Sequence, residues 1–75
     1  MTDLERRKLR MLREQYPGFL TANEALELAI YAEQTKRDCG PGDPAWRRFS
    51  YEQHAMETMA LLLEKEAAAA KAARA

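Results

Sequence analysis

The sequence predicts an all-α fold: a short N-terminal helix followed by an antiparallel helical hairpin with a long C-terminal helix, assembled as a homo-oligomer. Apolar residues recur at three- and four-residue spacing, and three segments open with residues that favour helix N-termini. The oligomer is expected because a 75-residue monomer buries only about 60% of the surface of its unfolded chain. We expect a single domain over 1–75, with helical segments at 1–16, 21–39 and 43–73.

The first segment opens with a capping box, Thr2-Asp3-Leu4-Glu5, in which the threonine and glutamate side chains each accept from the other residue's amide. Pro17-Gly18 ends this helix, because proline disfavours helical geometry in the residue before it. Its outer face is strongly basic. The apolar positions are Leu4, Leu9, Leu12 and Tyr16, and the basic positions are Arg6, Arg7, Lys8, Arg10 and Arg13.

The second helix also opens with a capping box, Thr21-Ala22-Asn23-Glu24, and we expect it to continue to about Asp38. The turn Gly40-Pro41-Gly42 cannot continue a helix, so the chain reverses there. The expected buried stripe consists of Ala25, Leu28, Ala29 and Ala32, widened by Leu26 and Ile30.

The third helix begins at Asp43-Pro44, an N-cap residue with proline at the first helical position. Its long apolar face exceeds what a two-helix hairpin covers, which predicts a subunit interface. The Ala-rich tail, residues 67–75, should continue the helix because alanine has the highest helix propensity. The expected interface residues are Trp46, Phe49, Met56, Met59 and Leu63, beside Ala60, Leu61 and Leu62.

Composition argues against several functions. Twelve Lys plus Arg balance twelve Asp plus Glu, whereas proteins that bind polymeric nucleic acid usually carry a basic excess. The first thirteen residues contain no apolar run, so we expect no signal peptide, no membrane span and a cytoplasmic protein. One cysteine cannot form an internal disulfide, which suits a reducing compartment.

The residue types also argue against catalysis, a metal and a cofactor. His54 is the single histidine, so no two-histidine metal site exists. No phosphate-binding glycine loop of a known type is present. A nucleophilic pair of Cys39 and His54 is conceivable, but an ordinary cysteine and a surface histidine explain both residues better. We therefore expect a binding protein rather than an enzyme.

A polar strip runs along the third helix, beside its apolar face. Arg47 and Arg48 lie near the helix start, where the helix dipole favours an anion. A cation, hydroxyls, an aromatic ring and an imidazole on one face suit a phosphorylated ligand that carries a base. An exposed, solvated helix flank is the other interpretation. The strip consists of Arg47, Ser50, Tyr51, His54 and Thr58.

The segment Pro44 to Glu57 has the pattern P-x-x-R-x-x-S-x(5)-[LM]-E, and Tyr16-Pro17 lies upstream of it. Together they resemble phage helical-hairpin proteins that act as cyclic-nucleotide sponges against CBASS and Thoeris immunity, over Tyr16 to about Lys65. Two features depart from that family: no Lys or Arg occurs from Ala29 to Tyr31, and His54 stands where a threonine is expected. The basic first helix is additional to the short pattern of that family.

The resemblance implies a homo-oligomer that sequesters a cyclic oligonucleotide or a cyclic ADP-ribose derivative without cleaving it, and so evades host immunity. By this resemblance Tyr16 would stack on a base, and Arg47 and Ser50 would lie on the helix that carries the family's sequence pattern. The expected ligand-binding residues are Tyr16, Arg47, Arg48, Ser50, Tyr51 and His54.

Two other functions stay open. A homodimeric inhibitor could dock on a host regulator or enzyme through its apolar patch or its basic first helix, which accounts better for that helix. The chain could also be a structural helical module of a larger assembly.

Overall fold

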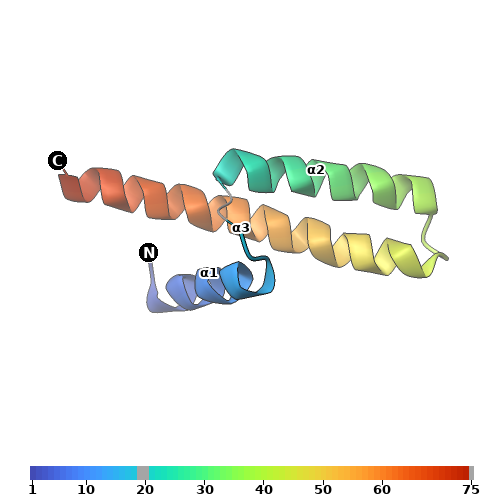
Figure 1. Cartoon of the computed structure of the whole chain (residues 1–75), viewed down its shortest axis with the longest axis horizontal. Coiled ribbons are helices and arrows are strands. Elements are labelled where there is room, and N and C mark those ends of the chain that lie inside the picture. Colours follow the sequence, from blue (N-terminus) through green and yellow to red (C-terminus); the bar gives the residue numbers. More distant parts are fainter. Residues whose placement is uncertain (19–20, 75) are drawn as a thin grey trace.

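The computed structural model describes residues 1–18 and 21–74, and this part of the chain forms three helices and no strands. α1 spans Asp3–Gln15, α2 spans Ala22–Cys39 and α3 spans Pro44–Arg74. α2 packs along α3 as an antiparallel hairpin, and α1 lies against α3 on the side away from α2 (Figure 1). The predicted all-α fold and its helical hairpin are confirmed, and α3 is the central element.

The three predicted helix starts are confirmed in detail. Thr2 and Thr21 each accept a hydrogen bond from the amide three residues on, at 3.1 and 3.2 Å, and the glutamate there accepts from the threonine amide. Asp43 caps α3 by accepting from the amide of Ala45 at 2.9 Å. Gly40 ends α2 with a φ of 79°, a conformation that favours glycine. Local sequence therefore determines where the helices begin and turn.

The hairpin core joins small residues of α2 to large residues of α3. The alanines are almost fully buried, so the two helix backbones approach closely and the larger side chains of α3 fill the space between them. This arrangement uses the alanine stripe as predicted. The buried residues are Ala25, Ala29 and Ala32 of α2, and Ala55, Met56, Met59, Ala60, Leu62 and Leu63 of α3.

The predicted stripe of α2 was too wide. Leu28 is 44% exposed, and Leu26 and Ile30 are each 47% exposed. The alanine contacts lie along the centre of the stripe, so α3 covers only this narrow centre. The longer side chains on both flanks of the alanines stay in contact with solvent. Leu4 of α1 is exposed as well.

α1 covers part of the apolar surface of α3 that we expected a second subunit to cover. Leu9 is 2% exposed and belongs to the same cluster as Ala55, Met59 and Leu62. Leu12, which is half-buried, packs against this cluster. The single chain thus closes its own core with a third helix.

This burial corrects the expected role of three residues at a subunit interface. Met56, Met59 and Leu63 are at most 9% exposed within one chain, so they belong to its own core rather than to a free surface. Trp46 and Phe49 are half-buried, and the Lys36 ammonium lies 5.3 Å from the centre of the Trp46 ring. Homo-oligomerisation itself stays a prediction.

The C-terminal part of α3 extends beyond both of its partners (Figure 1). The predicted helical continuation is confirmed to Arg74, and residues 67–74 are all exposed. Ala75, the last residue of the predicted tail, lies outside the described residues. Within the described part of the chain, no helix combines the length and the apolar character needed to cross a membrane.

Charged pairs fix how α1 lies on α3. The Lys65 ammonium donates to the Glu5 carboxylate near the start of α1. Arg13, near the end of α1, donates to both carboxylate oxygens of Glu66, at 2.7 and 3.1 Å. The Lys65 hydrogen bond, with that of the Thr2 amide, lowers the pKa of Glu5 from 4.5 to about 2. Because exposed ion pairs contribute little to stability, their main effect is to orient the helix.

The tight core predicts a large cost for truncating Met59, which is 1% exposed. We expect Met59→Ala to lower the free energy of unfolding by about 2–5 kcal/mol, because the space left behind is only partly refilled. The matched control is Leu61→Ala, since Leu61 is 54% exposed on the same helix and should cost under about 0.5 kcal/mol. Urea unfolding followed by circular dichroism measures both, and equal losses would contradict the described core.

The lowered pKa of Glu5 predicts a pH-dependent effect of Glu5→Gln. A carboxylate whose pKa falls on folding stabilises the folded state above its unfolded pKa and loses this effect as pH falls through its folded pKa. We therefore expect the variant to melt at a lower temperature than the original chain at neutral pH. The difference should shrink between pH 4.5 and about 2. A difference in melting temperature that does not change over this range would rule out the Lys65 contact as its cause.

Candidate ligand-binding site

An open pocket lies where the first turns of α3 extend past the end of α1. Its volume is about 540 Å³. It brings together Tyr16, from the N-terminal part of the chain, with Arg47, Arg48 and Tyr51 of α3, all of which the sequence indicated. We call it the arginine–tyrosine pocket. Its lining residues are Gln15, Tyr16, Pro44, Arg47, Arg48, Tyr51 and Glu52.

Tyr16 is held in this pocket by the end of α1. Its amide donates to the Leu12 carbonyl at 2.8 Å, which closes the last turn of the helix. The ring is half-buried against the core cluster. Burial raises the pKa of the Tyr16 phenol, and the nearby Glu52 carboxylate raises it further. The hydroxyl therefore stays protonated near neutral pH and is available as a hydrogen-bond donor.

The two arginines of the pocket differ in their contacts. The Arg48 guanidinium lies 3.6 Å from the Glu52 carboxylate, one helical turn further along, in an exposed ion pair. Arg47 is exposed and makes no ion pair with any residue of the described segments. Both follow Pro44 closely, near the N-terminus of α3, where the helix dipole adds a positive field. Among the described residues, the pocket thus offers the guanidinium of Arg47 without an ion pair. It also offers the guanidinium of Arg48, whose contact with Glu52 a more highly charged anion can replace.

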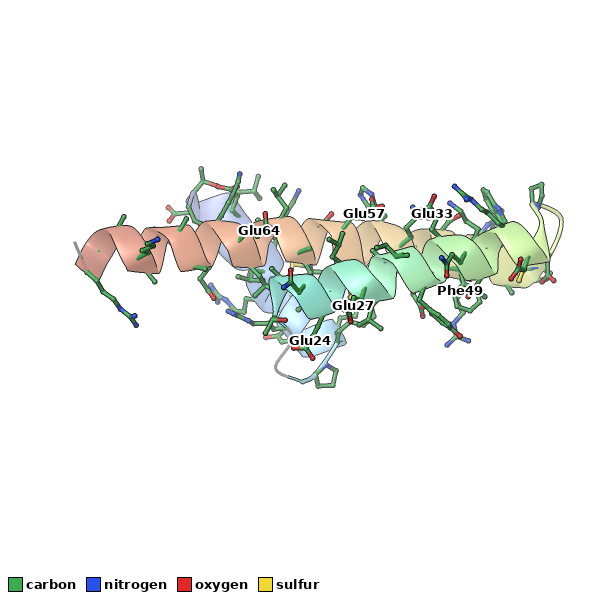
Figure 2. All side chains as sticks on the ribbon, turned by 90° about the horizontal axis from the view of Figure 1, so that it is seen from above. Glu24, Glu27, Glu33, Phe49, Glu57 and Glu64 are labelled. Atoms are coloured by element: carbon green, nitrogen blue, oxygen red, sulfur yellow. The ribbon has the colours of Figure 1, made fainter. Side chains whose placement is uncertain are left out.

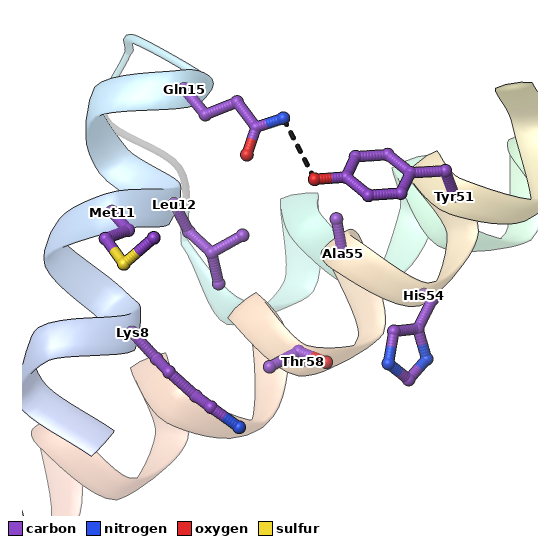
Figure 3. A pocket seen from close by; sticks show the side chains of 8 residues that line it. All are labelled: Lys8, Met11, Leu12, Gln15, Tyr51, His54, Ala55 and Thr58. Atoms are coloured by element: carbon purple, nitrogen blue, oxygen red, sulfur yellow. Dashed lines mark hydrogen bonds between the residues drawn. The ribbon is translucent and has the colours of Figure 1, made fainter. Parts of the chain in front are cut away.

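A second concavity, the α1/α3 groove, adjoins the first and has a volume of about 250 Å³. Figure 3 shows Gln15 donating to the Tyr51 hydroxyl, at 3.2 Å, between the two helices. These two residues line both concavities and form their shared boundary. The groove is lined by Lys8, Met11, Leu12, Gln15, Tyr51, His54, Ala55 and Thr58.

The structure separates two of the predicted ligand contacts from the arginine–tyrosine pocket. His54 lines the α1/α3 groove instead. Ser50 lines neither concavity, and its hydroxyl oxygen is buried without a hydrogen-bond partner among the described residues. The cause is helical geometry, because each residue is turned by about 100° from the one before it. Ser50 therefore faces a different direction from Tyr51.

Sequence reasoning missed several lining residues. Glu52 could have been found, since it follows Arg48 by four positions, the spacing of a helical ion pair. Gln15 had a weaker signal as the neighbour of Tyr16. Lys8 and Met11 line the groove because α1 lies across α3, and no pattern within either helix specifies that contact.

Residues 1–18 and 21–74 contain no group of three or more His, Cys, Asp or Glu side chains placed to hold a metal ion. Comparison of the chain with family models, with curated proteins and with solved structures finds no match.

Proposed function

We propose that this chain binds a small phosphorylated ligand that carries a base, such as a cyclic oligonucleotide or a cyclic ADP-ribose derivative, and sequesters it unchanged. The observation that supports this most is the meeting of Tyr16 and Tyr51 with Arg47 and Arg48 around one pocket. The four residues come from two helical segments that are distant in sequence. Aromatic rings beside guanidinium groups provide the two contacts that a nucleotide needs.

Phosphate would be bound by the arginines. A guanidinium forms paired, charge-assisted hydrogen bonds to phosphate oxygens, and Arg47 has no competing ion pair within the described residues. The exposed pair of Arg48 with Glu52 is weak enough to be exchanged for a phosphate. Glu52 also limits the positive charge of the pocket, which favours a small anion over a polyanionic nucleic acid.

The base would be bound by the tyrosine rings. Stacking of a base on an aromatic side chain contributes about 1–3 kcal/mol and tolerates different bases. Tyr51 is 59% exposed, so its ring is accessible at the edge of the pocket. Tyr16 is held by the core and provides the fixed side, with its protonated hydroxyl as a donor.

The biological role would be immune evasion. A phage protein present in excess of a nucleotide second messenger lowers the free concentration of that messenger by binding alone, and needs no catalytic group. The resemblance of the segment Pro44 to Glu57 to cyclic-nucleotide sponges supports this role. The host cytoplasm is where such a messenger would be met.

A panel of cyclic dinucleotides, cyclic trinucleotides and cyclic ADP-ribose isomers tests the proposal by thermal unfolding. A ligand present at a hundred times its dissociation constant should stabilise the chain by about 2.7 kcal/mol, or roughly 10 °C or more for a domain of this size. The ligand should be recovered intact after heating. No shift across the whole panel would overturn the proposal and favour a protein-binding inhibitor.

For the ligand found in that panel, Arg47→Ala should weaken binding roughly ten- to a hundredfold, because hydrogen bonds to charged groups contribute about 1.5–3 kcal/mol. The matched control is Arg10→Ala, which removes an exposed arginine from α1 that lines neither concavity. Isothermal titration calorimetry compares the two. Equal affinities would remove Arg47 from the site.

Stacking is tested by Tyr51→Ala, with Tyr31→Ala as its control. The two tyrosines are 59% and 62% exposed, but Tyr31 lies on α2 and lines neither concavity. We expect Tyr51→Ala to weaken binding by about five- to 150-fold, the equivalent of one stacked base, and Tyr31→Ala to leave it unchanged. Fluorescence titration with a labelled ligand measures both, and a similar loss in the two variants would argue against stacking.

A further inference from the structure

The α1/α3 groove has an apolar floor and a basic rim. Met11 is 61% and Tyr51 59% exposed at its edges. Leu4 lies seven residues before Met11 and continues the face of α1 that carries it. Leu61 lies seven residues after His54 and continues that face of α3. They are 61% and 54% exposed. The groove is lined by a lysine and a histidine and by no acidic residue.

α2 carries a surface with the opposite charge. Leu28 and Tyr31 are 44% and 62% exposed on one flank of this helix, and only acidic charges accompany them. On the other flank, beside Leu26 and Ile30, Arg37 neutralises Glu33 through a hydrogen bond of 2.7 Å. We call the acidic flank the α2 strip. It consists of Glu24, Glu27, Leu28, Tyr31 and Asp38, at helical spacings of three, four and seven.

The α2 strip cannot reach the groove of its own chain. α1 and α2 lie on different sides of α3, and their backbones do not approach each other closely in the described part of the chain (Figure 1). Figure 2, which looks onto the hairpin from the side of α2, shows Glu24 and Glu27 on α2 and α1 behind α3. Any pairing of strip with groove must therefore occur between two copies.

We propose that the α2 strip of one copy docks in the α1/α3 groove of another copy. Charge complementarity supports this occupant: α1 carries five basic and three acidic residues, whereas α2 carries two basic and four acidic. An amphipathic helix whose apolar side chains enter a groove is a common mode of association. The contact would also cover apolar side chains that a chain this small leaves exposed.

The strip and the groove lie on different sides of α3, so two copies do not exchange both contacts at once and the interface is heterologous. Each copy of a pair keeps one free strip or one free groove, and association continues head to tail into a ring or a filament. This inference goes beyond the proposed ligand binding. The groove adjoins the arginine–tyrosine pocket through Gln15 and Tyr51, but neither depends on the other to form.

Sedimentation velocity of the full chain over a wide range of concentrations tests this at low salt. The mean mass should rise from 8.6 kDa past that of a dimer, and fall again as salt screens the charges. Met11→Glu places an acid in the groove, and Tyr31→Lys places a base on the strip. Each variant alone should remain at 8.6 kDa.

A mixture of the two variants is the decisive sample. Met11→Glu retains an intact strip and Tyr31→Lys an intact groove, so the mixture should form dimers and nothing larger. Leu26→Glu and Ile30→Lys make the same types of change on the other flank of α2 and should associate like the original chain. Circular dichroism verifies that every variant is folded.

Several outcomes would overturn this inference. The original chain could stay monomeric at all concentrations, or the mixture of Met11→Glu with Tyr31→Lys could stay monomeric. The control variants Leu26→Glu and Ile30→Lys could also lose association to the same extent. A monomeric chain that binds a synthetic acidic amphipathic helix would instead assign the groove to a partner protein. If Tyr31→Lys prevents association but leaves nucleotide binding unchanged, self-association and ligand binding are independent of each other.

Discussion

The close packing of α2 on α3 is the constraint on which the rest of the structure depends. Ala25, Ala29 and Ala32 are at most 2% exposed, and their small size brings the two helices together along most of the hairpin. Met59 and its neighbours fill the centre from α3. Because the contact is narrow, the flanks of α2 remain exposed, and a separate face of α3 remains for α1.

The docking of α1 decides where the concavities form. Leu9 is its one residue that is fully buried, and the ion pairs of Glu5 and Arg13 with α3 are exposed. Such contacts hold orientation more than they add stability. The arginine–tyrosine pocket and the α1/α3 groove therefore both depend on the least buried of the three helices. Regions with few buried contacts open most readily. Binding at either concavity should therefore reduce the local opening of α1.

Zero net charge conceals a segregation of charge between the helices. α1 has a basic excess and α2 an acidic one, and they lie on different sides of α3. The chain lacks the basic excess that is usual in proteins that bind polymeric nucleic acid. It nevertheless places two arginines at one pocket and acidic side chains along one flank of α2. Local charge, not net charge, is thus the basis of both proposals.

The sequence by itself determined the helices and their direction, because capping boxes at Thr2 and Thr21 and the Asp43 cap act through contacts within three residues. Helical spacing likewise placed Arg47 and Tyr51 on related faces of α3. Only the tertiary structure decided that α1 covers part of the apolar face of α3, that Leu28 is exposed, and which side chains meet Tyr16. Those outcomes depend on how closely helices approach and at which angle they cross, and contacts between distant segments set both.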